Sequence, residues 1–81
     1  MPIRVLFFAS LAEVTGIREA ELDASDCSDV ASVFGRFARE FPGLQAHRAT
    51  LLCAINSEFA RSDSQVSDGD EIAFFPPVSG G

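Results

Sequence analysis

A single amphipathic helix is the strongest structural signal in this sequence, and it limits the chain to folds in which one helix covers one apolar layer. Six apolar residues recur at the three- and four-residue intervals that place side chains on one face of a helix. They are Val30, Val33, Phe34, Phe37, Ala38 and Phe41. Ser28 is placed to cap the first turn, and Asp26 and Asp29 suit the positive end of the helix dipole. Pro42 and Gly43 are expected to end the helix.

Four shorter segments have the β-branched, aromatic or alternating pattern that is typical of strands. They are residues 3–9, 18–23, 51–56 and 71–75. Residues 11–16 are expected to form a loop with at most a helical turn, and residues 57–67 a polar connection that contributes Val66 to the core. The tripeptide Asp68-Gly69-Asp70 predicts a tight turn before the last strand.

The order strand, strand, helix, strand, strand predicts an α+β protein with the β-grasp (ubiquitin-like) arrangement. Because one helix covers only one face of a sheet, we expect it to pack across a single mixed sheet whose first and last strands are parallel neighbours at the centre. The length of 81 residues leaves room for one domain, residues 1–81. The helix stripe and the inward-facing strand residues are enough to fill one small core. These strand residues are Val5, Phe7, Leu22, Cys53, Ile55, Ile72 and Phe74.

Apolar residues are left over on the opposite face of the predicted sheet, where an antiparallel sheet exposed to water is normally polar. They are Leu6, Phe8, Leu52, Ala54, Ala73 and Phe75, and Phe59 in the connection also has no obvious place in the core. Scattered surface hydrophobic residues are one interpretation. We favour a protein-docking face anchored by Phe8, Phe59 and Phe75, because large apolar residues that cluster mark interaction sites and aromatic residues dominate interface energies.

The segment after the last strand predicts a functional C-terminal tail, residues 76–81. Pro76 and Pro77 cannot continue the hydrogen-bonded ladder and favour an extended chain, while Gly80 and Gly81 give the narrowest possible cross-section. A frayed terminus is the alternative. We expect the tail to enter a partner, with Pro76, Pro77, Val78 and Ser79 in contact with it and Gly80 providing clearance. The Gly81 carboxylate would be activated as an anhydride with AMP, and a sulfur nucleophile would then convert it to a thiocarboxylate.

Composition and motifs exclude several other classes of function. The formal net charge is −6 and all six cations are Arg, so nucleic acids and anionic membranes are poor partners, and proteins with a basic docking surface are better ones. No segment approaches the roughly 20 apolar residues of a membrane span. His47 is expected in a solvated loop, Cys53 in the core, and Cys27 at the helix start, where its pKa could fall. We predict no metal site and no bound cofactor, and two thiols without a disulfide pattern fit the cytoplasm.

Specific residues link this chain to a known family. It resembles the small, sulfur-carrier subunits of molybdopterin synthase in Val5-Leu6-Phe7-Phe8-Ala9, in Ala54-Ile55-Asn56, in Asp68-Gly69-Asp70-Glu71-Ile72-Ala73, and above all in Phe75-Pro76-Pro77-Val78-Ser79-Gly80-Gly81. The resemblance covers the whole length. One departure is Ala12, where the family often has Arg, and it puts in doubt any ion pair which that Arg makes with a partner.

The resemblance implies a carrier and not a self-contained enzyme. An adenylating enzyme would use ATP to activate Gly81, and a sulfur donor would complete the thiocarboxylate. The charged carrier would then dock on the large synthase subunit, in a heterotetramer of two small and two large subunits, and give sulfur to cyclic pyranopterin monophosphate. Catalytic groups would lie on the large subunit. Three alternatives remain: a carrier for thiamin synthesis or tRNA thiolation, a ubiquitin-like protein modifier, and a passive binding module.

Overall fold

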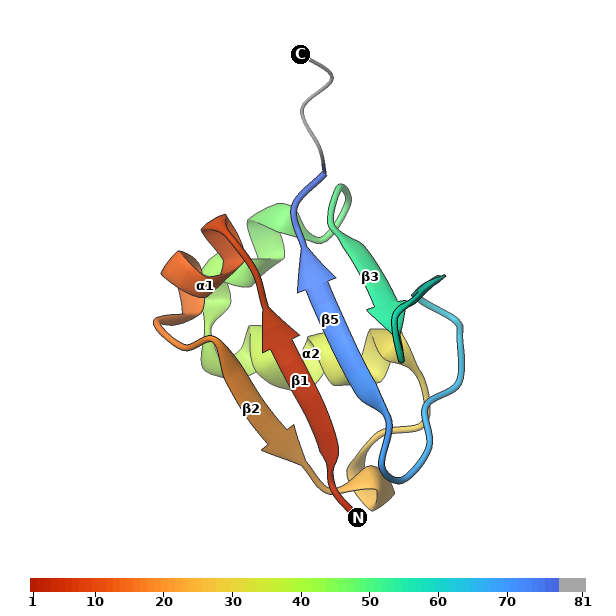
Figure 1. Ribbon diagram of the computed structural model, residues 1–81. Helices are drawn as coiled ribbons and strands as arrows, with labels where there is room; N and C mark the ends of the chain where they lie inside the picture. The colour runs from red at the N-terminus through yellow and green to blue at the C-terminus, as the bar shows by residue number, and fades with distance from the viewer. Residues whose placement is uncertain (78–81) are drawn as a thin grey trace.

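The computed structural model describes residues 1–77 and shows one five-stranded sheet with a helix across one face (Figure 1). In chain order the elements are β1 (Ile3–Phe7), α1 (Ser10–Thr15), β2 (Glu19–Leu22), the 3-10 turn η1 (Ala24–Asp26), α2 (Val30–Glu40), the 3-10 helix η2 (Pro42–His47), β3 (Leu52–Ile55), β4 (Glu58–Ala60) and β5 (Glu71–Phe75). The strand order across the sheet is β2-β1-β5-β3-β4.

The first and last strands lie side by side at the centre of the sheet, as predicted. β1 and β5 are parallel, with Val5 opposite Ile72 and Phe7 opposite Phe74. β2 pairs antiparallel with β1, and β3 pairs antiparallel with β5. Figure 1 shows α2 crossing behind these strands, so the opposite face of the sheet carries no helix. The predicted β-grasp fold is therefore confirmed.

The core lies between this sheet and α2. The ring of Phe7 meets that of Phe37 edge to face at a centroid distance of 5.2 Å, and Phe34 meets Phe74 in the same way at 5.7 Å. Such pairs add about 0.5–1.5 kcal/mol to the value of the buried area. The predicted core residues are buried or packed against the buried set, Val66 included. Leu11 and Leu44 complete the core from segments in which the sequence predicted only a loop and a helix stop.

The start of α2 differs from the prediction. Asp29, not Ser28, caps the helix: its side chain accepts a hydrogen bond from the backbone N–H of Ser32 at 2.9 Å. The Ser32 hydroxyl accepts from the backbone N–H of Asp29 at 3.1 Å, which completes a capping box. Asp29 lies one position after Ser28, and its side chain is long enough to reach the backbone N–H of Ser32. The helix ends at Glu40, before Pro42 as expected, and the chain continues directly as η2.

Two elements are larger than the sequence predicted. Residues 10–15 form a short helix, α1, which is closed by Gly16 in a left-handed conformation at φ 77°. The expected polar connection 57–67 contains β4, which pairs with β3 through a tight turn at Asn56 and Ser57. Both turn residues have positive φ, 51° and 73°, which is the geometry of the two-residue turns that join hairpin strands.

Candidate docking face and C-terminal strand

Cross-strand register places the leftover apolar residues in neighbouring rows on the helix-free face. One row runs through Leu6, Ala73, Ala54 and Phe59, because these residues are consecutive partners across β1, β5, β3 and β4. The next row contains Leu52 opposite Phe75, and Phe8 lies beside Phe75 at the end of β1. We call Leu6, Phe8, Leu52, Ala54, Phe59, Ala73 and Phe75 the apolar face.

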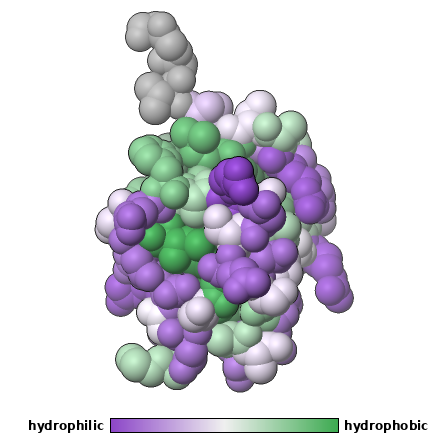
Figure 2. Space-filling model, turned by 90° about the vertical axis from the view of Figure 1, so that its right-hand side faces the viewer, coloured by the Kyte–Doolittle hydropathy of each residue, from purple (hydrophilic) through white to green (hydrophobic). Residues whose placement is uncertain are grey.

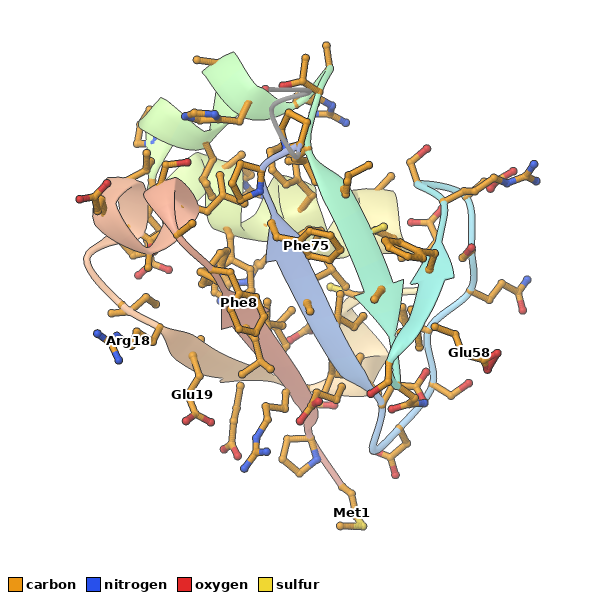
Figure 3. All side chains as sticks on the ribbon, turned by 45° about the horizontal axis from the view of Figure 1, so that its top comes forward. Met1, Phe8, Arg18, Glu19, Glu58 and Phe75 are labelled. Carbon is orange, nitrogen blue, oxygen red and sulfur yellow. The ribbon has the colours of Figure 1, made fainter. Side chains whose placement is uncertain are left out.

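Three large side chains of the apolar face are open to solvent, while Leu6 and Phe75 are half-buried. Phe59 is 81% exposed, Phe8 48% and Leu52 37%. The ring centroids of Phe59 and Phe75 lie 5.9 Å apart, and Figure 3 shows Phe8 and Phe75 on the same side of the sheet. Figure 2 views the edge that carries β3 and β4, where apolar surface is bordered by polar side chains. The structure thus brings the three predicted anchors together on one exposed face, while their role in docking stays a prediction.

Two alanines, Ala54 and Ala73, place small side chains in the middle of the apolar face. Ala54 and Ala73 are adjacent partners in the middle of the sheet, and the larger side chains of Phe59 and Leu6 continue the same row on either side. Both alanines are half-buried, so the middle of this row offers only methyl groups to solvent. A partner surface of complementary shape would pack its own apolar side chains against these small residues, which is how the central part of an interface excludes water.

A charged row borders the apolar face toward the start of β1. The Arg4 guanidinium lies 3.2 Å from Glu19 and 3.1 Å from Glu71, so it bridges the strands on either side of β1. Its hydrogen bond to Glu71 raises the pKa of Arg4 further above neutrality. Glu21, the partner of Arg4 in β2, adds another carboxylate. This border is net negative. Alternation with Ile3 and Val5 predicts that Arg4 points away from the core. Its ion-pair partners could not be predicted, because they depend on strand register.

The acidic turn before β5 has a structural role. The Asn56 side chain donates to Asp70 at 3.0 Å and accepts from the backbone N–H of Glu71 at 2.9 Å. The other Asp70 oxygen accepts from the backbone N–H of Ser67 at 2.8 Å, and Gly69 supplies the positive φ of 83° that the turn requires. These bonds tie the β3–β4 hairpin to the start of β5. The tight turn predicted at residues 68–70 is confirmed.

The predicted tail begins where β5 ends. Pro76 is half-buried and Pro77 is exposed, directly after the outward-facing Phe75. Val78, Ser79, Gly80 and Gly81 lie outside the described residues, so the predictions made for them stay predictions. The C-terminal end of β5 lies beside Phe8 and Leu52 and not beside the charged row. Because β5 runs toward this end of the sheet, the chain leaves β5 beside the apolar face.

The side chains set aside by the sequence analysis show no chemistry of their own. Cys53 and Cys27 are both free and buried, and burial raises the pKa of each thiol, so the position of Cys27 near the helix start does not lower its pKa. The helix N-terminus does not lower it because Cys27 precedes the Asp29 cap and faces the core. His47 is half-buried at the end of η2. Among residues 1–77 no cluster of His, Cys, Asp or Glu is arranged to hold a metal ion.

None of the helices that the structure describes is long and apolar enough to cross a membrane.

Fold and surface together define a ubiquitin-like β-grasp protein with an exposed apolar face at the end of its last strand. The chain belongs to the ThiS family, whose model matches residues 5–81. It is similar to the molybdopterin synthase sulfur carrier subunit of Chlamydomonas reinhardtii, with 34% identity over all of both chains. The corresponding subunit of Escherichia coli K12 is 38% identical over 98% of this chain and 99% of its own.

Solved structures show the same fold. The crystal structure of SAMP1 from Haloferax volcanii superposes with a TM-score of 0.82 at 30% identity over all of both chains. A chain in the complex of subunits 1 and 2 of the molybdopterin-converting factor from Helicobacter pylori superposes with a TM-score of 0.68 at 23% identity, again over all of both chains.

Proposed function

We propose that this protein is the sulfur carrier subunit of a molybdopterin synthase. One observation carries the proposal: a chain that matches sulfur carrier subunits over its full length places a large apolar face beside the end of β5, from which residues 76–81 continue. A carrier needs both features. The face holds the partner, and the segment after β5 delivers the reacting group.

The chemistry of the carrier takes place at the carboxylate of Gly81. A carboxylate oxygen attacks the α-phosphate of ATP and releases pyrophosphate, which gives an acyl adenylate on Gly81. A hydrosulfide ion from the sulfur donor then attacks the acyl carbon, the C–O bond to AMP breaks, and AMP leaves with the bonding electrons. The product is a thiocarboxylate, which is a better nucleophile than the original carboxylate. This chain supplies only the acyl group, and the adenylating enzyme supplies the binding site for ATP.

The second half of the reaction belongs to the partner subunit. The apolar face seats the carrier on the large subunit, and the tail enters the site where cyclic pyranopterin monophosphate receives sulfur. The catalytic groups lie on the large subunit, in an assembly of two small and two large chains. The exposed apolar face of this chain supports a docking role for it. Two free thiols suit a reducing compartment, and we place the carrier in the cytoplasm.

A protein modifier is a second candidate, because SAMP1 from Haloferax volcanii, a small archaeal modifier protein, is 30% identical over the whole chain. In that case the activated Gly81 acyl group would pass to a lysine amine of a target. The chain has no lysine of its own, so it could be attached singly but not linked into chains through its own side chains.

Intact-protein mass spectrometry tests the proposal. The protein is incubated with ATP, a cognate adenylating enzyme and a sulfur donor, in parallel with a variant that lacks Gly81. We expect the mass of the full chain to change by one oxygen-to-sulfur exchange and the mass of the variant to stay the same. An unchanged mass with active partner enzymes would overturn the sulfur-carrier proposal, and a mass equal to carrier plus target would favour the modifier.

A further inference from the structure

A cleft lies beside Phe8, between the end of β1, helix α1 and the start of β2. Its volume is about 750 Å³, and it opens on the same side of the sheet as the apolar face, with which it shares Leu6 and Phe8. Ala12 contributes a small side chain to its wall, and Glu13, Arg18 and Glu19 provide the charges around it. Figure 3 shows Arg18 and Glu19 on the side of Phe8 that faces away from Phe75. We call this the Phe8 cleft.

The wall of the Phe8 cleft is held in place by an unusual backbone conformation. Ala9 has φ 51° and ψ −128°, which residues other than glycine rarely adopt, and such strain is found where the surrounding structure fixes a functional geometry. The reversal at Ala9 lets the Phe8 carbonyl accept from the N–H of Leu11 at 3.0 Å, while the Phe8 N–H donates to Phe74 at 3.1 Å. Phe8 is therefore fixed from both β5 and α1.

The lining of the Phe8 cleft complements a long cationic side chain. Leu6, Phe8 and Ala12 offer apolar surface to an aliphatic stem, and the Phe8 ring can face a cation. Two carboxylates, Glu13 and Glu19, stand at the edge against one guanidinium, Arg18. Of the ion pairs within residues 1–77, none involves Glu13 or Arg18, while Glu19 is paired with Arg4. The lining therefore holds one more carboxylate than guanidinium, and the row of Arg4, Glu19, Glu21 and Glu71 beside it is also net negative. A partner cation would find an available carboxylate at Glu13 and a second, shared one at Glu19.

We propose that the Phe8 cleft receives an arginine or lysine side chain from the large synthase subunit, a contact that rests on the proposed function. The small side chain of Ala12 leaves the space that this cation occupies. The partner's cation adds specificity to the apolar face, since apolar surfaces exclude water but discriminate poorly among partners, whereas charges paired across an interface fix its register.

Paired charge-removing substitutions test the occupant by the sign of their effects. Binding to the purified large subunit is measured by surface plasmon resonance for Glu13→Gln and Arg18→Gln. Each has a matched control on α2, Glu40→Gln and Arg36→Gln, which changes the net charge equally but lies outside the cleft. We expect Glu13→Gln to raise the dissociation rate about ten-fold and Arg18→Gln to lower it. The α2 controls should alter only the association rate, because distant charges act by steering.

Filling the cleft gives an independent readout. Ala12→Phe should weaken binding by about ten-fold or more, and circular dichroism melting establishes that the variant is folded. Equal dissociation rates for Glu13→Gln and its control would overturn the cleft proposal. A lower dissociation rate for Glu13→Gln and a higher one for Arg18→Gln would also overturn it, because the occupant would then be a carboxylate. Phe59→Ala separates this failure from that of the proposed function. If Phe59→Ala also binds the large subunit normally, the docking face itself is wrong.

Discussion

Phenylalanine shows how single residues divide between stability and recognition in this protein. Phe7 is the last residue of β1 and Phe8 follows it, while Phe74 and Phe75 are the last two residues of β5. Alternation along each strand sends the first of each pair into the core, where Phe7 is 2% and Phe74 1% exposed, and the second to the apolar face. The same side chain therefore has two functions that depend only on which side of the sheet it occupies.

Substitution on the two faces should separate stability from binding. Phe59→Ala is expected to change the free energy of unfolding by less than about 0.5 kcal/mol, because the ring is mostly exposed, and to weaken binding of the large subunit at least ten-fold. Phe74→Ala should cost about 3–5 kcal/mol of stability, because it leaves a cavity against Phe7 and Phe34. Urea titration and calorimetric binding measure the two quantities. A destabilised Phe59→Ala that still binds normally would contradict this division.

At the scale of elements, the sequence predicted well those segments whose periodicity is long. The α2 stripe spans three turns, and both central strands have buried residues at every second position. β4 and α1 were underestimated for different reasons. β4 is three residues long and exposes Phe59, so it has no buried face to generate a pattern. In α1 only Leu11 and Thr15 are buried, too few to distinguish a helix from a loop.

The candidate site shows the same limit. Alternation was enough to place Phe8 and Phe75 outward, and the absence of a core position pointed to Phe59. The Phe8 cleft could not be predicted, because it depends on the backbone reversal at Ala9 and on the packing of α1 against the sheet. Neither the backbone reversal nor this packing produces a periodic pattern in the sequence. Alanine rarely adopts a positive φ, so local propensity does not predict the reversal either.

Two glycines should respond in opposite directions to alanine. A Cβ at Gly35, within α2, would meet no atom within 4 Å apart from its chain neighbours and the backbone of its own helix, so Gly35→Ala should stabilise the protein by about 0.5–1 kcal/mol. Gly69 has φ 83°, so Gly69→Ala should destabilise it by a similar amount or more. Chemical denaturation with a common m-value gives both changes. Stabilisation by Gly69→Ala would mean that the turn before β5 differs from the one described.

The capping box at the start of α2 predicts a dependence of stability on pH. Hydrogen bonds from the Ser32 side chain and backbone hold the pKa of Asp29 below its usual range. The contribution of a depressed carboxyl is complete above its unfolded pKa, about 4, and is lost as the pH falls through the folded value. Ser32→Ala should lower the free energy of unfolding at pH 7, and this free energy should fall less than that of the parent below pH 4. Ser62→Ala is the control, since none of the described side-chain hydrogen bonds uses its hydroxyl. Parallel pH curves for Ser32→Ala and its parent would contradict this role.

For the whole molecule, one core protects both thiols. Cys27 is 7% and Cys53 6% exposed, and burial raises the pKa of each. The thiolate is the reactive form, so native protein should react with an aromatic disulfide reagent many times more slowly than protein in denaturant, and the reaction should accelerate as the pH rises. Absorbance of the released thiol measures the reaction. Rapid labelling of one thiol in the native protein would show that the core opens locally.

The parallel pairing of β1 with β5 has a consequence for the synthesis of the chain. Arg4 faces Glu71 across the centre of the sheet, so β1 cannot pair with β5 until residues 71–75 have been translated. Contacts between segments so far apart form slowly, and no shorter nascent chain can complete the sheet. A ribosome-bound intermediate therefore lacks both the finished apolar face and the strand that leads to the tail. An incomplete chain would thus lack the surface with which we expect the finished protein to bind its partner.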